Sequence, residues 1–184
     1  DYDKIKIENE QYKKFLEIKE ENPEYEIAAA SVIGRDGMDK FWSFTIDAGE
    51  KDGIEENDVV MSSIGVVGVV VETGPNFSKV STILSPSVSA ASFVSSTRDT
   101  GVVCGDSRYS SKGKTLIKYL PKNTQAEIGD IISTTGMGEV FPKDLLIGTI
   151  EEIITDTSGN YSYAVVKPAS DVAEVKTVFI IKSY

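Results

Sequence analysis

The 184-residue sequence contains no histidine and a single cysteine, Cys104. Histidine is the general base of Ser-His-Asp triads and Cys-His dyads and the commonest protein metal ligand, so its absence excludes these arrangements. A lone cysteine can form neither an internal disulfide nor a structural zinc site, which takes four ligands drawn largely from cysteine and histidine. We therefore expect neither a metal nor another cofactor.

Long hydrophobic runs and an excess of basic residues are also missing. The longest weakly polar run, residues 64–71, is far shorter than the roughly 20 residues that span a bilayer. Asp and Glu total 29 against 19 Lys and Arg, giving a net charge of -10, and such a surface repels phosphate backbones. Nucleic acid is not an expected partner. The chain starts at Asp1 without a methionine, so we expect an upstream targeting or anchoring segment.

The first 22 residues lack glycine and proline and are rich in Glu and Lys, which predicts a helix that ends before Pro23. Five residues recur at alternating spacings of three and four and form the expected dimer interface of a coiled coil: Tyr2, Ile5, Asn9, Tyr12 and Leu16. A buried asparagine in such a seam fixes register and favours a parallel dimer. In the alternative interpretation, the helix packs on its own domain through Ile7, Phe15 and Ile18.

After Pro23 the hydrophobic pattern changes to a period of two. Trp42, Phe44 and Ile46 alternate with polar residues, as in a half-buried strand, and are expected to face the core. About a dozen short strand candidates continue to the C-terminus with turn residues between them, including a hairpin turn at residues 156–160. This rhythm is typical of antiparallel barrels or a sandwich, so the chain is predicted to be mainly β.

Two passages, residues 54–68 and 128–148, share a local plan. Asp58 precedes an apolar pair and follows Phe44 by 14 residues, and Asp130 does the same after Leu116. The repeat indicates two related modules, although common turn chemistry would produce much of it. The second copy has eight additional residues, 136–143. We take them as the candidate partner contact of the second module: Gly136, Met137, Gly138, Glu139, Phe141 and Pro142.

Two other kinds of chemistry stay open. Ser133, Thr134 and Thr135 form the densest group of hydroxyls in a structured context, and a Ser-Lys hydrolase could use one of them. Its candidate bases are Lys112, Lys114 and Lys143. The structural alternative is a strand end whose hydroxyls satisfy a tight turn. A glycan- or peptide-binding module would instead use exposed aromatic rings, for which the candidates are Trp42, Tyr109 and Tyr119.

A series of segments, taken in order, carries a family resemblance from Glu8 to Ile181. They are VIGRD at residues 32–36, WSFTIDAG at 42–49, GVVGVV at 65–70, GVVCG at 101–105, YLP at 119–121, GDIISTTG at 129–136, FP at 141–142 and IG at 147–148. No single segment would suffice, but their order and spacing closely resemble the rod shape-determining protein MreC family.

The resemblance implies an N-terminal helix that forms a coiled-coil stalk, followed by two small antiparallel six-stranded β-barrels. We expect the helix at residues 1–23, the first barrel at 24–100 and the second at 101–184. The last strand, residues 175–182, either closes the second barrel or returns to the first. Such barrels resemble those of chymotrypsin-like proteases, and the lack of histidine independently denies this chain their chemistry.

The resemblance also implies a function without enzymatic activity. Members of the family are scaffolds of the bacterial cell-elongation machinery that self-associate and position peptidoglycan-synthesis enzymes. The implied partners are a second copy of the chain, the elongation-specific penicillin-binding transpeptidase, MreD and MreB. The implied location is the extracytoplasmic face of the cell membrane, to which a transmembrane helix upstream of this sequence would anchor the protein.

Overall fold

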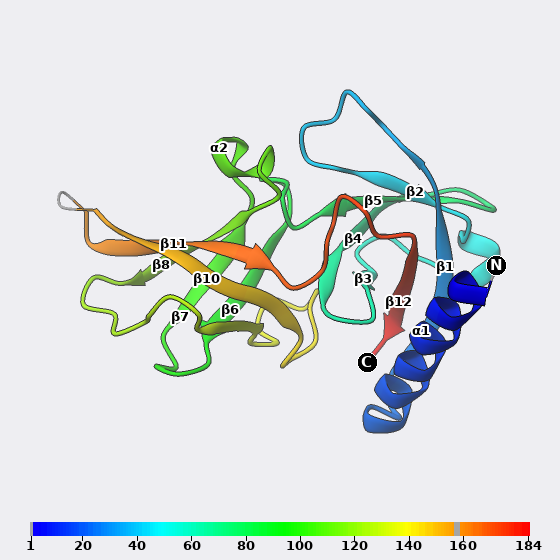
Figure 1. The fold of residues 1–184 in the computed structure, drawn as a ribbon, viewed down its shortest axis with the longest axis horizontal. Coiled ribbons are helices and arrows are strands. Elements are labelled where there is room, and N and C mark those ends of the chain that lie inside the picture. The colour runs from blue at the N-terminus through cyan, green and yellow to red at the C-terminus, as the bar shows by residue number, and fades with distance from the viewer. Residues whose placement is uncertain (1, 157–158) are drawn as a thin grey trace.

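A computed structural model describes residues 2–156 and 159–184, and it has one long helix followed by two closed barrels (Figure 1). Helix α1 spans Tyr2–Glu21, as its composition predicts, and ends just before Pro23. The prediction of a mainly β chain with two six-stranded antiparallel barrels is confirmed. Within the described ranges, no helix combines the length and the apolar character needed to cross a lipid bilayer.

The first barrel has the closed strand order β1-β12-β3-β4-β5-β2. Its strands are β1 (Glu26–Arg35), β2 (Phe44–Ile46), β3 (Val59–Met61), β4 (Val66–Thr73), β5 (Ser78–Thr82) and β12 (Thr177–Ser183). A short 3-10 helix, Glu50–Asp52, follows β2. All strand pairs are antiparallel. Because the strand order is closed, each strand pairs on both sides and the barrel has no free edge.

The second barrel has the closed order β10-β11-β8-β7-β6-β9. Its strands are β6 (Ser89–Val94), β7 (Thr100–Cys104), β8 (Thr115–Pro121), β9 (Ile131–Thr134), β10 (Leu146–Thr155) and β11 (Tyr161–Pro168). A one-turn helix, α2 (Ser107–Ser110), connects β7 to β8. Strands β10 and β11 pair as a hairpin, but the turn predicted at residues 156–160 includes residues 157 and 158, which lie outside the described ranges.

Two strands change the expected division of the chain at residues 100 and 101. Strand β6 pairs with β7 and β9, so the second barrel begins at residue 89 rather than 101. Strand β12 pairs with β1 and β3, so the C-terminus returns to the first barrel. Turn signals mark where strands begin and end, but they do not say which sheet a strand joins. The chain therefore crosses between the barrels twice, at residues 83–88 and 169–176.

The two barrels have the same topology once β12 is counted as the first strand of the first barrel. In that order, β12, β1, β2, β3, β4 and β5 correspond to β6, β7, β8, β9, β10 and β11. Every neighbouring pair in one closed barrel then has its counterpart in the other. The C-terminal strand thus occupies in the first barrel the place that β6 occupies in the second.

The sequence repeat falls on structurally equivalent positions. Asp58 precedes β3 and Asp130 precedes the corresponding β9. The Asp58 carboxylate accepts a hydrogen bond from the Glu55 backbone N–H at 2.8 Å, and the Asp130 carboxylate accepts one from Glu127 N–H at the same distance. Each aspartate therefore closes the turn that leads into its strand. Both the order of the strands and these bonds favour two related modules over chance similarity.

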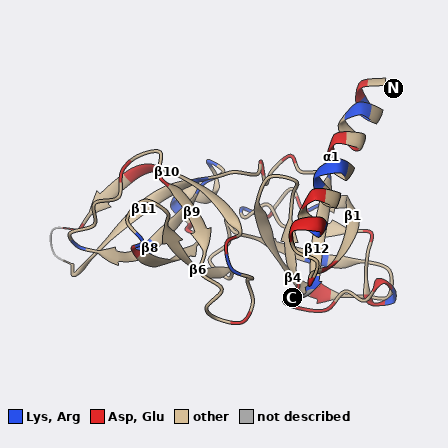
Figure 2. Ribbon diagram, turned by 90° about the horizontal axis from the view of Figure 1, so that it is seen from below, with Lys and Arg blue, Asp and Glu red and all other residues tan. Residues whose placement is uncertain are grey.

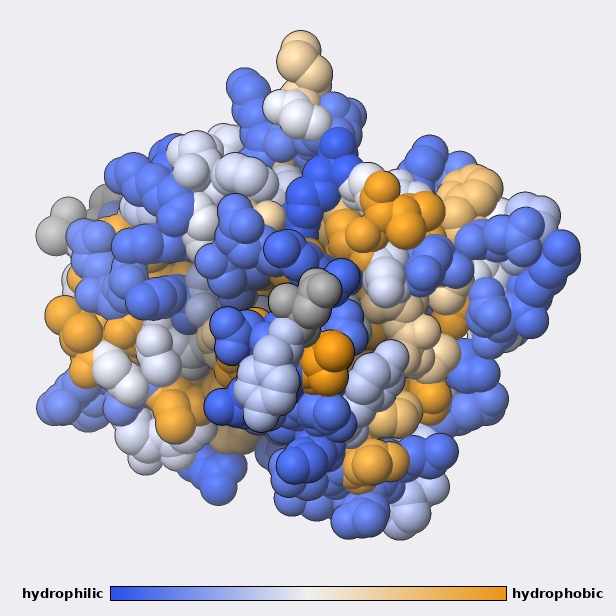
Figure 3. Space-filling view, turned by 45° about the vertical axis from the view of Figure 1, so that its right-hand side comes forward, coloured by the Kyte–Doolittle hydropathy of each residue, from blue (hydrophilic) through white to orange (hydrophobic). Residues whose placement is uncertain are grey.

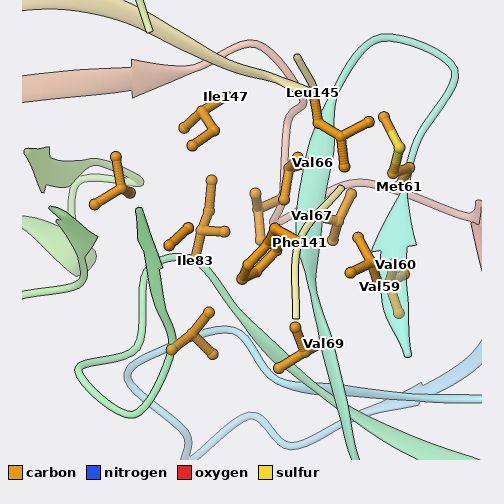
Figure 4. Packing of buried hydrophobic residues seen from close by; sticks show 14 of the residues in the cluster. Val59, Val60, Met61, Val66, Val67, Val69, Ile83, Phe141, Leu145 and Ile147 are labelled. Atoms are coloured by element: carbon orange, nitrogen blue, oxygen red, sulfur yellow. The ribbon is translucent and has the colours of Figure 1, made fainter. Parts of the chain in front are cut away.

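The barrels meet across a closely packed junction. Phe141 belongs to the same buried cluster as Val66 and Val67 of β4, which Figure 4 shows from close by. A Cβ atom added at Gly65 would lie 2.6 Å from the Leu146 carbonyl oxygen of β10, so only glycine permits this approach. The apolar interior is consequently one continuous cluster that includes residues of both barrels.

Polar contacts also form at the junction. Ser62, just after β3, and Ser170, in the crossing segment 169–176, are buried and hydrogen-bonded to each other, and the Ser170 hydroxyl donates to Gly65 O at 3.1 Å. Trp42 lies just before β2 rather than in a strand, has a φ of +62°, and donates its indole N–H to Ser110 O of α2 at 3.0 Å. The expectation that Trp42 alternates into the barrel core is wrong, because its ring bridges to the neighbouring barrel and is 37% exposed.

Candidate functional site

Helix α1 packs on the first barrel through one face of its C-terminal half. The Phe15 ring stacks on Phe179 of β12, with ring centroids 5.0 Å apart and planes inclined by 22°. Gln11 and Ile18, on the same face, are partly buried. Two of the three residues in the self-packing interpretation, Phe15 and Ile18, therefore contribute to packing, whereas Ile7 is 56% exposed.

The predicted dimer residues lie on a different face of α1 and stay exposed. We call Tyr2, Ile5, Asn9, Tyr12 and Leu16 the helix stripe. Its four large apolar or aromatic members are 81%, 56%, 55% and 54% exposed, in that order along the chain. The N-terminal half of α1 projects away from the first barrel, and bands of both charge signs run along the helix (Figure 2). Exposed apolar side chains in a row typically mark a surface for association.

The isolated helix would gain little stability from itself. It has 20 residues and none of them is buried, and in proteins most of the stability of a helix comes from tertiary packing of one apolar face. On the face of the molecule that includes α1, hydrophobic residues form separate groups among hydrophilic ones (Figure 3). Within the helix stripe, Tyr12 borders a pocket between α1 and the first barrel, yet it stays 55% exposed, and Tyr2, Ile5 and Leu16 are also more than half exposed.

The hydroxyls of the β9–β10 connection are engaged with backbone groups. Thr134 Oγ1 donates to Pro142 O at 2.6 Å and accepts from Leu145 N–H at 2.9 Å. Thr135 Oγ1 donates to Ala91 O at 3.2 Å. Among the three candidate bases, Lys114 forms an ion pair with Glu151. None of the three donates a hydrogen bond to residues 133–135 in the described part of the chain, so the contacts support the structural interpretation of these hydroxyls.

The candidate partner contact at residues 136–143 divides into two parts. Gly136, Met137, Gly138 and Glu139 are exposed, with Met137 at 73%, and we call these four residues the loop tip. Phe141 and Pro142 are buried, so the expectation that they contact a partner is corrected, and Phe141 belongs to the apolar cluster at the junction between the barrels. The loop is also tied to the C-terminus, because Tyr184 OH donates to Glu139 O at 2.6 Å.

The candidate aromatic residues do not form one platform. Trp42 lies at the junction, and the Tyr109 ring is covered by the Arg108 guanidinium, whose Cζ lies 5.6 Å from its centroid. Tyr119 instead packs edge to face on Tyr161, with centroids 5.7 Å apart, and both rings are more than half exposed. Sequence reasoning missed Tyr161, because pairing between β8 and β11 is not visible in a single sequence.

An ion pair at α2 borders this tyrosine pair. Asp106 is the N-cap of α2 and accepts hydrogen bonds from Arg108 through its backbone N–H, Nε and Nη2, each at 2.9 Å. The Arg108 side chain and the backbone N–H together lower the pKa of Asp106 to about 2. Asp106 is therefore ionised at neutral pH and balances the charge of Arg108. No group of three or more Cys, Asp or Glu side chains in residues 2–156 and 159–184 is placed to hold a metal.

These features define a two-barrel β protein with a projecting helix and two exposed surfaces, the helix stripe and the loop tip. The family described as "Rod shape-determining protein MreC, barrel core" matches residues 32–182. The chain belongs to this MreC family, as its motifs predict.

Relatives and solved structures agree with this assignment. The chain is 31% identical to the cell shape-determining protein MreC of Listeria monocytogenes over 182 residues, which cover 97% of this chain and 61% of that protein. A solved structure of MreC from Listeria monocytogenes has a TM-score of 0.78 and 25% identity, covering 100% of this chain and 92% of that one. The chain thus spans about three-fifths of the curated relative it matches.

One solved structure contains a partner. It is a complex between penicillin-binding protein PBP2 and MreC from Helicobacter pylori, and it matches this chain with a TM-score of 0.63 and 15% identity. The match covers 86% of this chain and all of that one. At this identity the likeness concerns the fold.

Proposed function

We propose that the chain is the barrel-bearing part of a non-enzymatic, dimeric scaffold of the cell-elongation machinery. The observation that carries this proposal is the division of α1 into two faces. Phe15 and Ile18 lie on the face that packs on the first barrel, while the helix stripe is exposed. A second copy of α1 would bury the stripe, with Asn9 setting the register.

In the proposed scaffold, two pairs of barrels are held at a fixed direction relative to the stalk. The stack of Phe15 on Phe179 joins α1 to the first barrel, and the junction around Gly65 joins the first barrel to the second. A force or a contact at the helix would therefore be transmitted to both barrels. This arrangement suits a protein that positions enzymes rather than acting on their substrate.

The proposed partner is the elongation-specific penicillin-binding transpeptidase, on the extracytoplasmic side of the cell membrane. The Helicobacter pylori complex supports a partner of this type for the family fold. The loop tip is the proposed contact in the second barrel, because Met137 is 73% exposed and two glycines flank it. MreD, MreB and an upstream transmembrane anchor complete the proposed assembly.

Sedimentation tests the proposed dimer with two matched variants. Ile5 and Ile7 are both 56% exposed on α1, but only Ile5 belongs to the helix stripe. We expect Ile5→Asp to convert the dimer to a monomer, because a carboxylate in the seam is desolvated without a partner. Ile7→Asp should remain dimeric. Equal dissociation constants for the two variants, or a monomeric parent chain at about 100 μM, where micromolar association would be saturated, would contradict the proposal.

A further inference from the structure

A shallow groove on the second barrel combines exposed aromatic rings with basic side chains. Its volume is about 380 Å³, and strands β8 and β11 supply most of its lining. Tyr119 and Tyr161 meet there at an interplanar angle of 89°, so their rings form a corner rather than one flat surface. Leu116 lies beneath, and Lys118, Arg108 and Asp156 are the charged residues of the lining. The volume is within the range of small-ligand sites.

The backbone holds Tyr119 in an uncommon conformation. Its φ is +64°, in the left-handed region that non-glycine residues rarely adopt. The β8–β11 pairing shifts register between Ser162 and Ala164, opposite this position. Such a bulge re-aims a side chain, and bulges of this kind are frequent beside functional sites. Tyr119 is 59% exposed, so the bulge directs the ring outward instead of into the core.

Charges of both signs line the groove of this acidic chain, whose net charge is -10. The charged lining residues are Lys118, Arg108 and Asp156. Asp106 balances Arg108 through its paired hydrogen bonds. Lys118 has no ion pair among the described residues, so its ammonium group can attract an anionic ligand. Since the tyrosines flank it, the ligand should combine a carboxylate with a group that packs on aromatic rings.

The closed barrel favours a sugar chain over an extended peptide. A peptide that binds a β-sheet usually adds a strand to a free edge, and its backbone hydrogen bonds supply affinity. Strand β8 is already paired on both sides, with β7 and β11. A ligand must therefore be recognised by side chains alone. Sugar rings meet this condition, because their C–H faces carry partial positive charge and pack on the negative face of an aromatic ring.

We propose that this groove binds a short segment of a carboxylated sugar chain. The two tyrosine rings contact the sugar faces, and the Lys118 ammonium pairs with a sugar carboxylate. The site is separate from the helix stripe and from the loop tip, so it does not depend on the proposed dimer or on the transpeptidase. It adds direct contact with an anionic polysaccharide to the proposed scaffold.

Chemical-shift titration of the intact chain tests this site. The probe is a tetrasaccharide of alternating N-acetylglucosamine and N-acetylmuramic acid, and its neutral counterpart is the tetramer of N-acetylglucosamine. We expect shifts centred on Tyr119 and Tyr161, with binding of the carboxylated probe about tenfold tighter than that of the neutral one. Tyr161→Ala should weaken binding about tenfold or more, while Tyr161→Phe, which keeps the ring, should restore most of it.

A matched pair of lysines tests the charge. Lys118→Gln should bring the affinity for the carboxylated probe down to that for the neutral probe. Lys122→Gln changes an exposed lysine just after the same strand, outside the groove, and should leave the affinity unchanged. The proposal is wrong if neither sugar shifts the groove resonances at about 10 mM, a limit well above weak millimolar binding. It is also wrong if hexaglutamate binds as tightly as the carboxylated sugar, which would indicate an acidic peptide site.

Discussion

Ending the chain at Lys176 is expected to unfold the first barrel while the second stays folded. The change removes β12, which lies between β1 and β3 and supplies four buried side chains: Val178, Phe179, Ile180 and Ile181. Burial of each such side chain contributes about 1.5–3 kcal/mol. Their joint loss is comparable with the roughly 5–15 kcal/mol by which whole domains are stable. All six strands of the second barrel lie within residues 89–168 and remain.

Backbone amide spectra distinguish the two barrels in this experiment. Resonances of residues 26–82 should collapse to the narrow range of an unfolded chain, whereas those of residues 89–168 should stay dispersed. A chain that ends at Lys182 keeps all four buried residues and is the control, which should retain both sets. Dispersed signals from the first barrel without β12 would show that five strands suffice, contrary to the closed order described above.

Phe141→Ala is expected to destabilise the protein by about 3–5 kcal/mol, the usual cost of truncating a buried phenylalanine. Phe141 is 4% exposed and belongs to the cluster that joins the two barrels (Figure 4). Its removal leaves a cavity at a junction where Gly65 already brings the backbones into contact, so collapse around the cavity is restricted.

Met137→Ala, four residues earlier in the same loop, is the control for that measurement. Met137 is 73% exposed, so its truncation should change the free energy of unfolding by less than about 0.5 kcal/mol. Urea denaturation of both variants gives the comparison. If Phe141→Ala were as mild as Met137→Ala, Phe141 would not hold the junction, and its original interpretation as a surface contact would be restored.

Much of the fold could be predicted from local sequence patterns. The absence of glycine and proline before Pro23 predicted α1 almost to the residue, and alternation of apolar and polar residues predicted the β-rich remainder. The repeated aspartates, Asp58 and Asp130, close equivalent turns in the two barrels, so this part of the repeat reflects a physical need for a side-chain acceptor of a backbone N–H at each turn.

Long-range features could not be predicted in the same way. Strands β6 and β12 look like any other short strand, and only pairing with distant partners assigns them to a barrel, as between Glu26 of β1 and Ser183 of β12, which are 157 residues apart in the sequence. The sequence around Phe141 resembles an exposed loop, and Trp42 alternates with Phe44 and Ile46 as a core residue would. Each of the two nevertheless lies at the junction. Burial there depends on how two finished barrels pack, which no local pattern encodes.

The helix stripe illustrates a different limit. One helical sequence can offer an apolar face to its own domain and another to a partner, and spacing alone does not say which is used. Here the two interpretations describe different faces, because Phe15 packs on the first barrel while Leu16, the next residue, is 54% exposed. The self-packing face and the proposed dimer face can therefore be occupied at the same time.

The mass of the complex with the elongation-specific penicillin-binding transpeptidase tests the proposed scaffold most directly. Sedimentation of the chain mixed with the soluble transpeptidase should give a particle containing two copies of each protein. With Ile5→Asp the particle should contain one copy of each, and with Ile7→Asp it should again contain two. The account would be contradicted if the parent chain failed to bind the transpeptidase. It would also be contradicted if all three chains gave a particle with a single copy of each protein.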